Sequence, residues 1–292
     1  MDKLIYGEKY SKKIVLALGY FDSIHKGHQQ LLNTAKKLST KYNALSTVLI
    51  FTGGYKGKNI FTLEERLLRL KTMGVEKVIV KELTQDFMKK TYQEFIEELL
   101  SSYNIVGIVT GKDFTYGYKG LGDITYLEEI CKQNKIEYIP IDLEKDCGEK
   151  ISSTKIKGLL DRGDIKKVNE LLKGNYFIYG KVEKGKGVGK TLGFPTANIK
   201  ISQDKYPLKQ GVYLTFVYVD NALHSAITNV GSQPTFRGEE YIIETYIDNF
   251  SKDIYDKYLT VYFIERIRDI IEFDSIEGLE NQLLLDKEWL KW

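Results

Sequence analysis

The stretch IVLALGYFDSIHKGHQQLLNTAKKLSTKY, residues 14–42, joins an apolar run to an amphipathic run through a short turn. Residues 14–21 are almost all apolar, which is typical of a strand buried on both faces. From Gly27 onward, apolar residues recur at helical spacing. The stretch therefore predicts a strand, a turn and a helix, which is the repeating unit of a parallel α/β sheet.

The same alternation continues to about residue 143. It predicts further strands at 44–51, 76–83, 104–111 and 136–143, and helices at 27–42, 62–74, 91–103 and 123–134. Strands alternating with helices predict a parallel sheet covered on both faces, with ligands at the carboxyl ends of the strands.

After about residue 170 the pattern changes. Strand-like, β-branched and aromatic segments are separated by turn residues at 175–185, 211–221, 223–231, 241–250 and 257–268, and a helix follows at 275–292. This half predicts a small antiparallel β-barrel with a C-terminal helix. A short helix pair at 159–175 would join the halves, so the predicted domains are residues 1–170 and 171–292.

Composition narrows the class of protein. Hydrophobic residues at 42% and charged residues at 28% are typical of a globular protein, and no apolar run approaches a membrane span. The 43 basic and 40 acidic residues give a net charge of only +3, which argues against a nucleic-acid partner. The start, MDKLIYGEKYSKK, does not read as a signal peptide, and Cys131 and Cys147 fit neither a disulfide scaffold nor a zinc site. We expect a cytoplasmic protein.

The turn at the start of the first helix holds two of the chain's three histidines, His25 and His28, around Gly27. Their ring nitrogens could donate to phosphate oxygens while the helix N-terminus adds unpaired N–H groups and partial positive charge. The pattern indicates chemistry on a nucleoside triphosphate. The alternative is that the two histidines only cap the helix or pack under a loop. A metal site is less favoured, because no third histidine, cysteine or carboxylate lies at a spacing typical of metal ligands.

Three motifs in this half resemble prokaryotic FAD synthetases of the nucleotidyltransferase superfamily. Residues 19–28, GYFDSIHKGH, resemble G-x-F-D-G-x-H-x-G-H; residues 111–117, GKDFTYG, resemble G-x-D-F-x-F-G; and residues 151–157, ISSTKIK, resemble I-S-S-T-x-I-R. The resemblance implies a Rossmann-like domain in which His25 and His28 are catalytic. It also implies phosphate binding by Gly19, Phe21, Asp22, Gly27, Ser152, Ser153, Thr154 and Lys157, and a nucleotide and flavin pocket at Asp113, Phe114 and Gly117. Ser152, Ser153 and Thr154 could equally cap the helix that follows them.

The sequence departs from that pattern at three places. Ser23 stands at the second glycine of the signature, and Lys157 replaces an arginine, which keeps the charge but loses the bidentate fork. The family's P-H-P segment is absent, and the chain has FTGGYKGKNIFT at 51–62 instead. Tyr55, Lys56 and Lys58 could substitute, or the segment could be a glycine-rich loop without a ligand.

A second glycine cluster lies in GKVEKGKGVGKTLGFPTANIKI, residues 180–201. Glycines let backbone amides approach phosphates, and the neutral oxygens of Thr196 and Asn198 suit Mg²⁺. The alternative is an ordinary hairpin turn. The segment is not a Walker A loop, because no helix follows it.

Residues 185–198 resemble the riboflavin kinase signature G-x-x-x-G-[RK]-x-L-G-F-P-T-A-N. The resemblance implies that Glu244 is the catalytic base for the ribityl hydroxyl, that Arg268 binds the flavin, and that Thr196 and Asn198 hold Mg²⁺. It implies ATP and phosphate binding by Gly185, Gly189, Lys190, Gly193, Pro195, Thr196 and Asn198. Because a base must reach its proton, Glu244 should face the PTAN segment, although a surface position on its strand is the alternative. The family has histidine where Tyr246 stands.

Taken together, the resemblances imply a bifunctional transferase for flavin cofactor synthesis. Riboflavin would be phosphorylated to FMN with MgATP, and FMN adenylylated to FAD with release of pyrophosphate. Riboflavin, FMN, ATP and FAD are the expected partners. Two alternatives remain: an enzyme with only the kinase activity, and a flavin-binding protein without turnover. Oligomeric state does not follow from the sequence.

Overall fold

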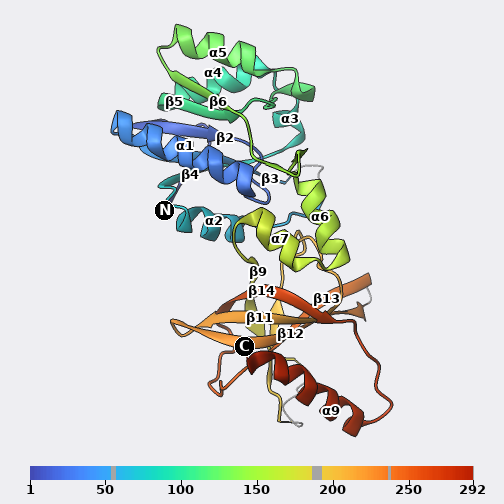
Figure 1. Cartoon of the computed structure of the whole chain (residues 1–292). Helices are drawn as coiled ribbons and strands as arrows, with labels where there is room; N and C mark the ends of the chain where they lie inside the picture. The colour runs from blue at the N-terminus through green and yellow to red at the C-terminus, as the bar shows by residue number, and fades with distance from the viewer. Residues whose placement is uncertain (54–56, 186–192, 236–237, 292) are drawn as a thin grey trace. The chain divides into compact units, whose positions relative to one another are not determined.

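The computed structural model of the chain describes residues 1–53, 57–185, 193–235 and 238–291. It divides into two compact units, Met1–Gly57 with Arg66–Ile151 and Lys58–Glu65 with Ser152–Trp292. The first holds a six-stranded sheet and the second a closed six-stranded barrel followed by a helix (Figure 1). The fold class expected from the sequence is confirmed.

The sheet of the first unit is parallel throughout, in the order β1-β4-β3-β2-β5-β6. Its strands are β1 (Asp2–Ile5), β2 (Tyr10–Leu18), β3 (Leu45–Thr52), β4 (Lys77–Glu82), β5 (Tyr103–Gly111) and β6 (Glu137–Ile141). The helices among them are α1 (Lys26–Tyr42), α2 (Leu63–Thr72), α3 (Gln85–Met88), α4 (Tyr92–Ser102), α5 (Ile124–Gln133) and the 3₁₀ turn η1 (Tyr118–Gly120). A hairpin of β7 (Lys145–Asp146) and β8 (Glu149–Lys150) follows β6.

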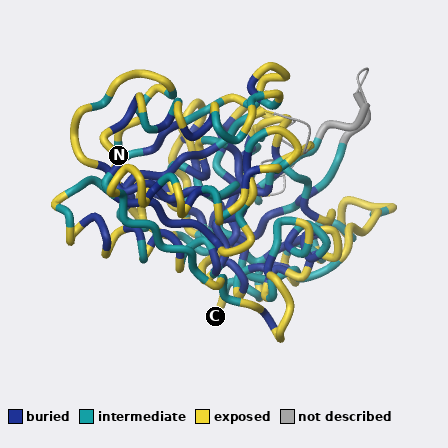
Figure 2. Tube along the Cα trace, turned by 90° about the horizontal axis from the view of Figure 1, so that it is seen from above, coloured by how far each residue is buried: buried dark blue, intermediate teal, exposed yellow. Residues whose placement is uncertain are grey.

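Both faces of this sheet are covered, which explains why its strands read as continuous apolar runs. Leu16 of β2 belongs to a core with Leu99 of α4 and Leu127 of α5. On the opposite face, a Cβ added at Gly107 of β5 would lie 2.6 Å from Leu38 of α1. Helices α4 and α5 therefore lie on one face and α1 on the other (Figure 1), and the strands between them are buried (Figure 2).

The order of the strands creates a switch point in the sheet. From β2 the chain passes to β3 and β4 on one side, and β5 and β6 then lie on the other side of β2. The connections that leave the carboxyl ends of β2 and β5 therefore diverge, which opens a crevice where ligands bind in such sheets. The segments concerned are residues 19–25 and 112–117.

The second unit is an antiparallel barrel in the order β10-β13-β12-β11-β14-β9, closed by pairing of β9 with β10. Its strands are β9 (Tyr176–Glu183), β10 (Thr196–Lys200), β11 (Gly211–Val219), β12 (Ala222–Thr235), β13 (Gly238–Ile247) and β14 (Tyr258–Arg268). Helices α6 (Ser153–Arg162) and α7 (Ile165–Leu172) precede the barrel, and α9 (Ile276–Lys287) and η2 (Glu288–Lys291) follow it. Buried hydroxyls of Thr215, Thr228 and Thr245 bond one another across three strands, which fixes the inward face of each strand.

The predicted domain boundary at residue 170 differs from the division into compact units. Helix α7 packs on β9 and β14, and Asn169 ties it there by donating from Nδ2 to the carbonyl of Phe263 and accepting from the Tyr176 amide. Residues 152–170 therefore pack with the barrel. The boundary of the functional domains stays a prediction.

Several details differ from the elements expected from the sequence. The first sheet strand ends at Leu18 rather than at residue 21, because the chain turns at Phe21 and Ile24 with φ of 46° and 48°. Four short strands were not expected: β1, β10 and the hairpin strands β7 and β8. Strand β10 begins at Thr196 and so carries the last three residues of the PTAN segment, whose composition reads as a loop.

A buried ion pair holds residues 58–65 in the second unit. The Lys205 ammonium lies 2.6 Å from Glu65 Oε2, both side chains are 1% exposed, and Glu65 also accepts from the amides of Thr62 and Tyr179. For Lys205→Met we expect a loss of about 3–5 kcal/mol in the free energy of unfolding, because Glu65 would keep an uncompensated buried charge. Urea denaturation followed by the fluorescence of the chain's two tryptophans, Trp289 and Trp292, reports on this unit.

The matched control is Lys200→Met. Lys200 pairs with Glu183 at 3.0 Å, but the side chains are 62% and 49% exposed, so about 0–1 kcal/mol is expected. Equal losses in the two variants would contradict a special role for the buried pair.

Candidate active sites

The first candidate site, here called the sheet site, comprises residues 19–28 with Asp113, Phe114 and Gly117. Its first part is the connection between β2 and α1, in which residues 21–25 are all buried. Phe21 and Ile24 adopt positive φ, a conformation that costs non-glycine residues free energy and is concentrated at functional sites. A Cβ added at Gly27 would lie 3.2 Å from the His25 ring, so the glycine lets this ring pack against the helix start.

The two histidines lie face to face at the N-terminus of α1. Their ring centroids are 3.9 Å apart at 23°, and His25 caps the helix by accepting the His28 amide at Nδ1, 3.4 Å away. The expectation that a histidine caps the helix is thus met by His25. Among the described residues, Nδ1 of His28 is buried without a hydrogen-bond partner. The His25 ring is therefore bonded to the backbone, whereas the His28 ring has an unused hydrogen-bonding atom, Nδ1.

The environment keeps both rings neutral at physiological pH. Burial, reinforced by the charge of Lys150, lowers the pKa of His25 to about 4. Burial, with His25 and Lys150, holds the pKa of His28 well below its usual value. Since Nδ1 of His25 accepts a hydrogen bond, the proton of its neutral ring is on Nε2, where it can be donated. The first turn of α1 contains no acidic residue, so its dipole adds to an anion-binding field.

The second part of the sheet site follows β5. Asp113 forms an ion pair with Lys150 of β8, and both charges act on His25. The ring of Phe114 stacks on Tyr116 at 5.4 Å and 17°. At Gly117, φ is +74° and a Cβ would lie 2.6 Å from the backbone of Tyr92, so only glycine fits. The structure thus brings the first and second motifs together at the switch point.

Sequence reasoning missed Lys150. The available signal was its position immediately before Ile151 and the Ser152–Thr154 motif. Its proximity to His25 follows from the two-residue turn of the β7–β8 hairpin, which composition does not predict.

From Ser152 onward, the third motif belongs to the second compact unit. Ser152 is the N-cap of α6 and accepts from the Lys155 amide at 3.2 Å, as the capping interpretation expects, and Ser153 and Thr154 form the first turn. The Lys157 ammonium donates to the carbonyl of Lys58 at 2.5 Å and lies 4.9 Å from the Tyr206 ring centroid. Three residues were possible substitutes for the P-H-P segment. The structure shows the backbone carbonyl of Lys58 accepting the Lys157 ammonium, and Tyr55 and Lys56 lie outside the described residues.

The second candidate site, here called the barrel site, comprises Gly185, Gly193, Pro195, Thr196, Asn198 and Glu244. In the β10–β13 register, Thr196 faces Tyr246 and Asn198 faces Glu244. Residues directly opposite one another in an antiparallel pair project from the same face. Because Ala197 and Thr245 are buried in the barrel, the four paired side chains lie on its outer face, which satisfies the requirement that Glu244 face the PTAN segment.

The described ends of the glycine-rich segment are Gly185 and Gly193. A Cβ at Gly185 would lie 2.1 Å from the side-chain amide of Asn198, so the chain passes directly against this residue. Gly193 adopts φ of +78°. Gly189 and Lys190 lie outside the described residues.

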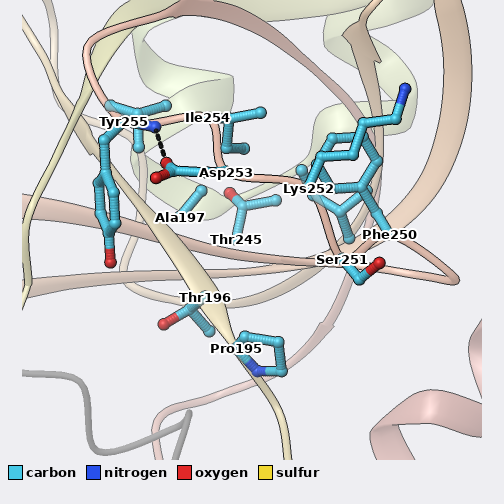
Figure 3. Close-up of a pocket in the computed structure, with 12 residues that line it drawn as sticks. Pro195, Thr196, Ala197, Thr245, Phe250, Ser251, Lys252, Asp253, Ile254 and Tyr255 are labelled. Atoms are coloured by element: carbon cyan, nitrogen blue, oxygen red, sulfur yellow. Dashed lines mark hydrogen bonds between the residues drawn. The ribbon is translucent and has the colours of Figure 1, made fainter.

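A cavity of about 240 Å³ adjoins the barrel site. Figure 3 shows Pro195 and Thr196 at one end and the segment from Phe250 to Tyr255 around the rest. The Asp253 carboxylate accepts the Tyr255 amide at 2.9 Å, which shapes this segment. The lining combines aromatic and aliphatic groups with a few polar ones, the mixture typical of small-molecule sites.

Arg268 makes contacts that the sequence does not predict. Its guanidinium donates to both carboxylate oxygens of Asp286 on α9, at 2.8 and 2.6 Å, and to the carbonyl of Asp269. It therefore anchors the C-terminal helix to β14. Its assignment to the flavin stays a prediction.

No helix among the described residues combines the length and apolar character needed to cross a bilayer.

Comparison with known proteins adds independent information. A family model described as FAD synthetase matches residues 7–155, and one described as riboflavin kinase matches residues 172–291. The bifunctional riboflavin kinase/FMN adenylyltransferase of Listeria monocytogenes is 30% identical over 284 residues, covering 94% of this chain and 90% of the relative. The protein of the same name from Bacillus subtilis is 31% identical over 288 residues, covering 94% and 91%.

A solved structure from Streptococcus pneumoniae has the same fold over the whole chain. The TM-score is 0.87 at 32% identity, with 99% of each chain covered. Its title describes a macrolide-efflux protein.

Proposed function

The chain belongs to the bifunctional riboflavin kinase/FMN adenylyltransferase family, and from this premise we propose that its barrel site makes FMN and its sheet site converts FMN to FAD. The enzyme is a transferase with one domain for each activity, and ATP is the co-substrate of both. The observation that carries the proposal is the β10–β13 register, which puts a carboxylate beside the hydroxyl and amide expected to hold a metal nucleotide.

In the barrel site, Glu244 acts as the general base. It takes the proton of the terminal ribityl hydroxyl of riboflavin while that oxygen attacks the γ-phosphorus of ATP. The bond to the β-phosphate oxygen breaks and ADP leaves. Phosphoryl transfer requires little covalent chemistry from the protein. Positioning of the substrates and stabilisation of charge therefore account for most of the rate acceleration.

Thr196 and Asn198 fit a magnesium ion. Their hydroxyl and amide oxygens lie two residues apart on one face of β10, next to the carboxylate of Glu244. Mg²⁺ prefers such oxygens together with phosphate and water oxygens. When bound, the ion would neutralise phosphate charge, and Gly185 leaves Asn198 room to turn toward it.

We place the adenosine of this ATP in the cavity beside Thr196. Phe250 and Tyr255 offer apolar surface for a planar base, and Thr196 stands where the cavity meets the phosphate-binding segment.

In the sheet site, an oxygen of the FMN phosphate attacks the α-phosphorus of ATP and pyrophosphate leaves. His25 and His28 donate to the phosphates as neutral rings, and the α1 N-terminus and Lys150 supply positive charge. Asp113, Phe114 and Gly117 form the wall of the nucleotide and flavin pocket. We assign Ser152, Ser153, Thr154 and Lys157 to pyrophosphate through the resemblance.

The departures from the family pattern concern this reaction. Ser23 is fully buried, so the change from glycine lies within the loop and not on its surface. The Lys157 ammonium bonds to the carbonyl of Lys58 and would have to exchange this partner for phosphate. An enzyme with the kinase activity alone is therefore the second candidate. We place the enzyme in the cytoplasm, because both its cysteines are free thiols.

The test is a chromatographic time course of the purified chain with riboflavin, ATP and Mg²⁺. We expect FMN and ADP first, then FAD and pyrophosphate, and we expect a chelator to stop both steps until Mg²⁺ is restored. FMN without FAD would establish the kinase-only alternative. Flavin binding without either product would contradict catalysis altogether.

A further inference from the structure

The C-terminal helix α9 is fixed to the barrel by one buried carboxylate. Asp286 is 3% exposed, accepts hydrogen bonds from Nε and Nη2 of Arg268, and also accepts from Gln282 at 2.9 Å. A bidentate pair of this kind fixes the rotation of a helix as well as its position. The direction of the next residue, Lys287, is therefore determined.

Lys287 is directed at strand β13. Its ammonium lies 5.7 Å from the ring centroid of Tyr246 and 3.8 Å from the carboxylate of Asp248. The neighbouring Tyr246 raises the pKa of Lys287, so the side chain is charged at physiological pH.

Tyr246 lies on the same face as the barrel site. It is paired with Thr196, it stands two residues from Glu244, and its ring is 5.4 Å from that of Phe194 in the GFPTAN segment. The contact between Tyr246 and Lys287 therefore brings a cation of α9 to the face where the metal nucleotide is proposed to bind.

The two strands that form this face, β10 and β13, carry little positive charge of their own. Strands β10 and β13 contain one basic residue, Lys200, whose ammonium pairs with Glu183 at 3.0 Å. Glu244 and Asp248 are acidic, and the ATP phosphates add further negative charge. Transfer of a phosphoryl group requires that such charge be balanced by fixed cations.

We propose that Lys287, held beside the Tyr246 ring and oriented by the Arg268–Asp286 anchor, binds the phosphates of ATP in the barrel site. Tyr246 is a positioning residue and Lys287 contacts the substrate. The ammonium forms no covalent bond and transfers no proton; it offsets negative charge. The inference rests on the proposed kinase function and also gives a role to the tyrosine that stands at the family's histidine position.

The test compares Lys287→Met, Lys287→Arg and Tyr246→Leu in steady-state riboflavin phosphorylation. For Lys287→Met we expect kcat/KM for ATP to fall about 10–100-fold, less than for a fully buried donor because the side chain is 44% exposed. Lys287→Arg should recover most of that loss, because it keeps the charge. For Tyr246→Leu, which removes the ring beside the ammonium, we expect a kcat/KM between those of the two Lys287 variants, mainly through a higher KM for ATP. FAD formation from FMN should stay at the wild-type rate in all three.

The control is Lys291→Met, which removes a 70% exposed lysine paired with Glu288 in the same C-terminal segment. It should leave kcat/KM unchanged. Wild-type kinetics in Lys287→Met would overturn the proposal, and so would equal losses in the Met and Arg variants, which would indicate helix packing instead. If the wild-type chain makes no FMN, the proposed kinase function itself is contradicted. A wild-type chain that makes FMN together with a Lys287→Met variant of unchanged kinetics contradicts only the role of Lys287.

Discussion

In a Glu244→Gln variant we expect riboflavin phosphorylation to slow by about 10²–10⁴-fold, the range for loss of a general base. Glutamine has nearly the same shape, so the β10–β13 pairing and the adjoining cavity should survive. Riboflavin binding, measured by quenching of flavin fluorescence, should therefore change little. The measurement is the initial rate of FMN formation at saturating ATP and riboflavin.

Glu265→Gln is a suitable control for this substitution. Glu265 lies on β14 and pairs with Lys166 at 2.6 Å, away from the β10–β13 pair. The Glu265→Gln variant should phosphorylate riboflavin at the wild-type rate. An unchanged rate in Glu244→Gln would contradict the role of Glu244 as base, and its carboxylate would then be a surface group on the barrel.

For His28→Ala the expected effect is on the other activity. FAD formation from FMN should fall by about 10²–10³-fold, the loss typical of one donor to transition-state charge. His28→Asn, which keeps an N–H donor near the same position, should recover part of that rate. Riboflavin phosphorylation should be unaffected, because it takes place in the barrel.

Asn33→Ala, an exposed position on the same helix, controls for loss of α1 stability. If it slowed FAD formation as much as His28→Ala, the effect would come from the helix and not from the ring. If His28→Ala lowered both activities equally, the two sites would not be independent.

The sequence predicts that the first two motifs of the sheet site meet, because each motif is contiguous. Residues 19–28 form one turn between a strand and a helix, and parallel topology brings the end of β5 beside them. Lys150 could not be predicted, because its approach to His25 depends on a two-residue hairpin turn. The placement of residues 58–65 could not be predicted either, since Glu65 finds its buried partner Lys205 140 positions away.

The barrel site shows a different limit. The glycine cluster and the PTAN segment were evident, but strand β10 was not, because five residues with threonine and asparagine read as a turn. The register of that strand decides which side chains share a face with Glu244. Arg268 and Lys287 also depend on the docking of α9, whose apolar residues do not form a clear stripe along one face in the sequence.

The most direct test of two independent sites is a mixing experiment with riboflavin, ATP and Mg²⁺. Alone, His28→Ala should accumulate FMN, and Glu244→Gln should make FAD only when FMN is supplied. Mixed in one tube, the two variants should convert riboflavin to FAD, because FMN released by the first is used by the second. If each variant lacked both activities and the mixture made no FAD, the account of two separate sites in one chain would be contradicted.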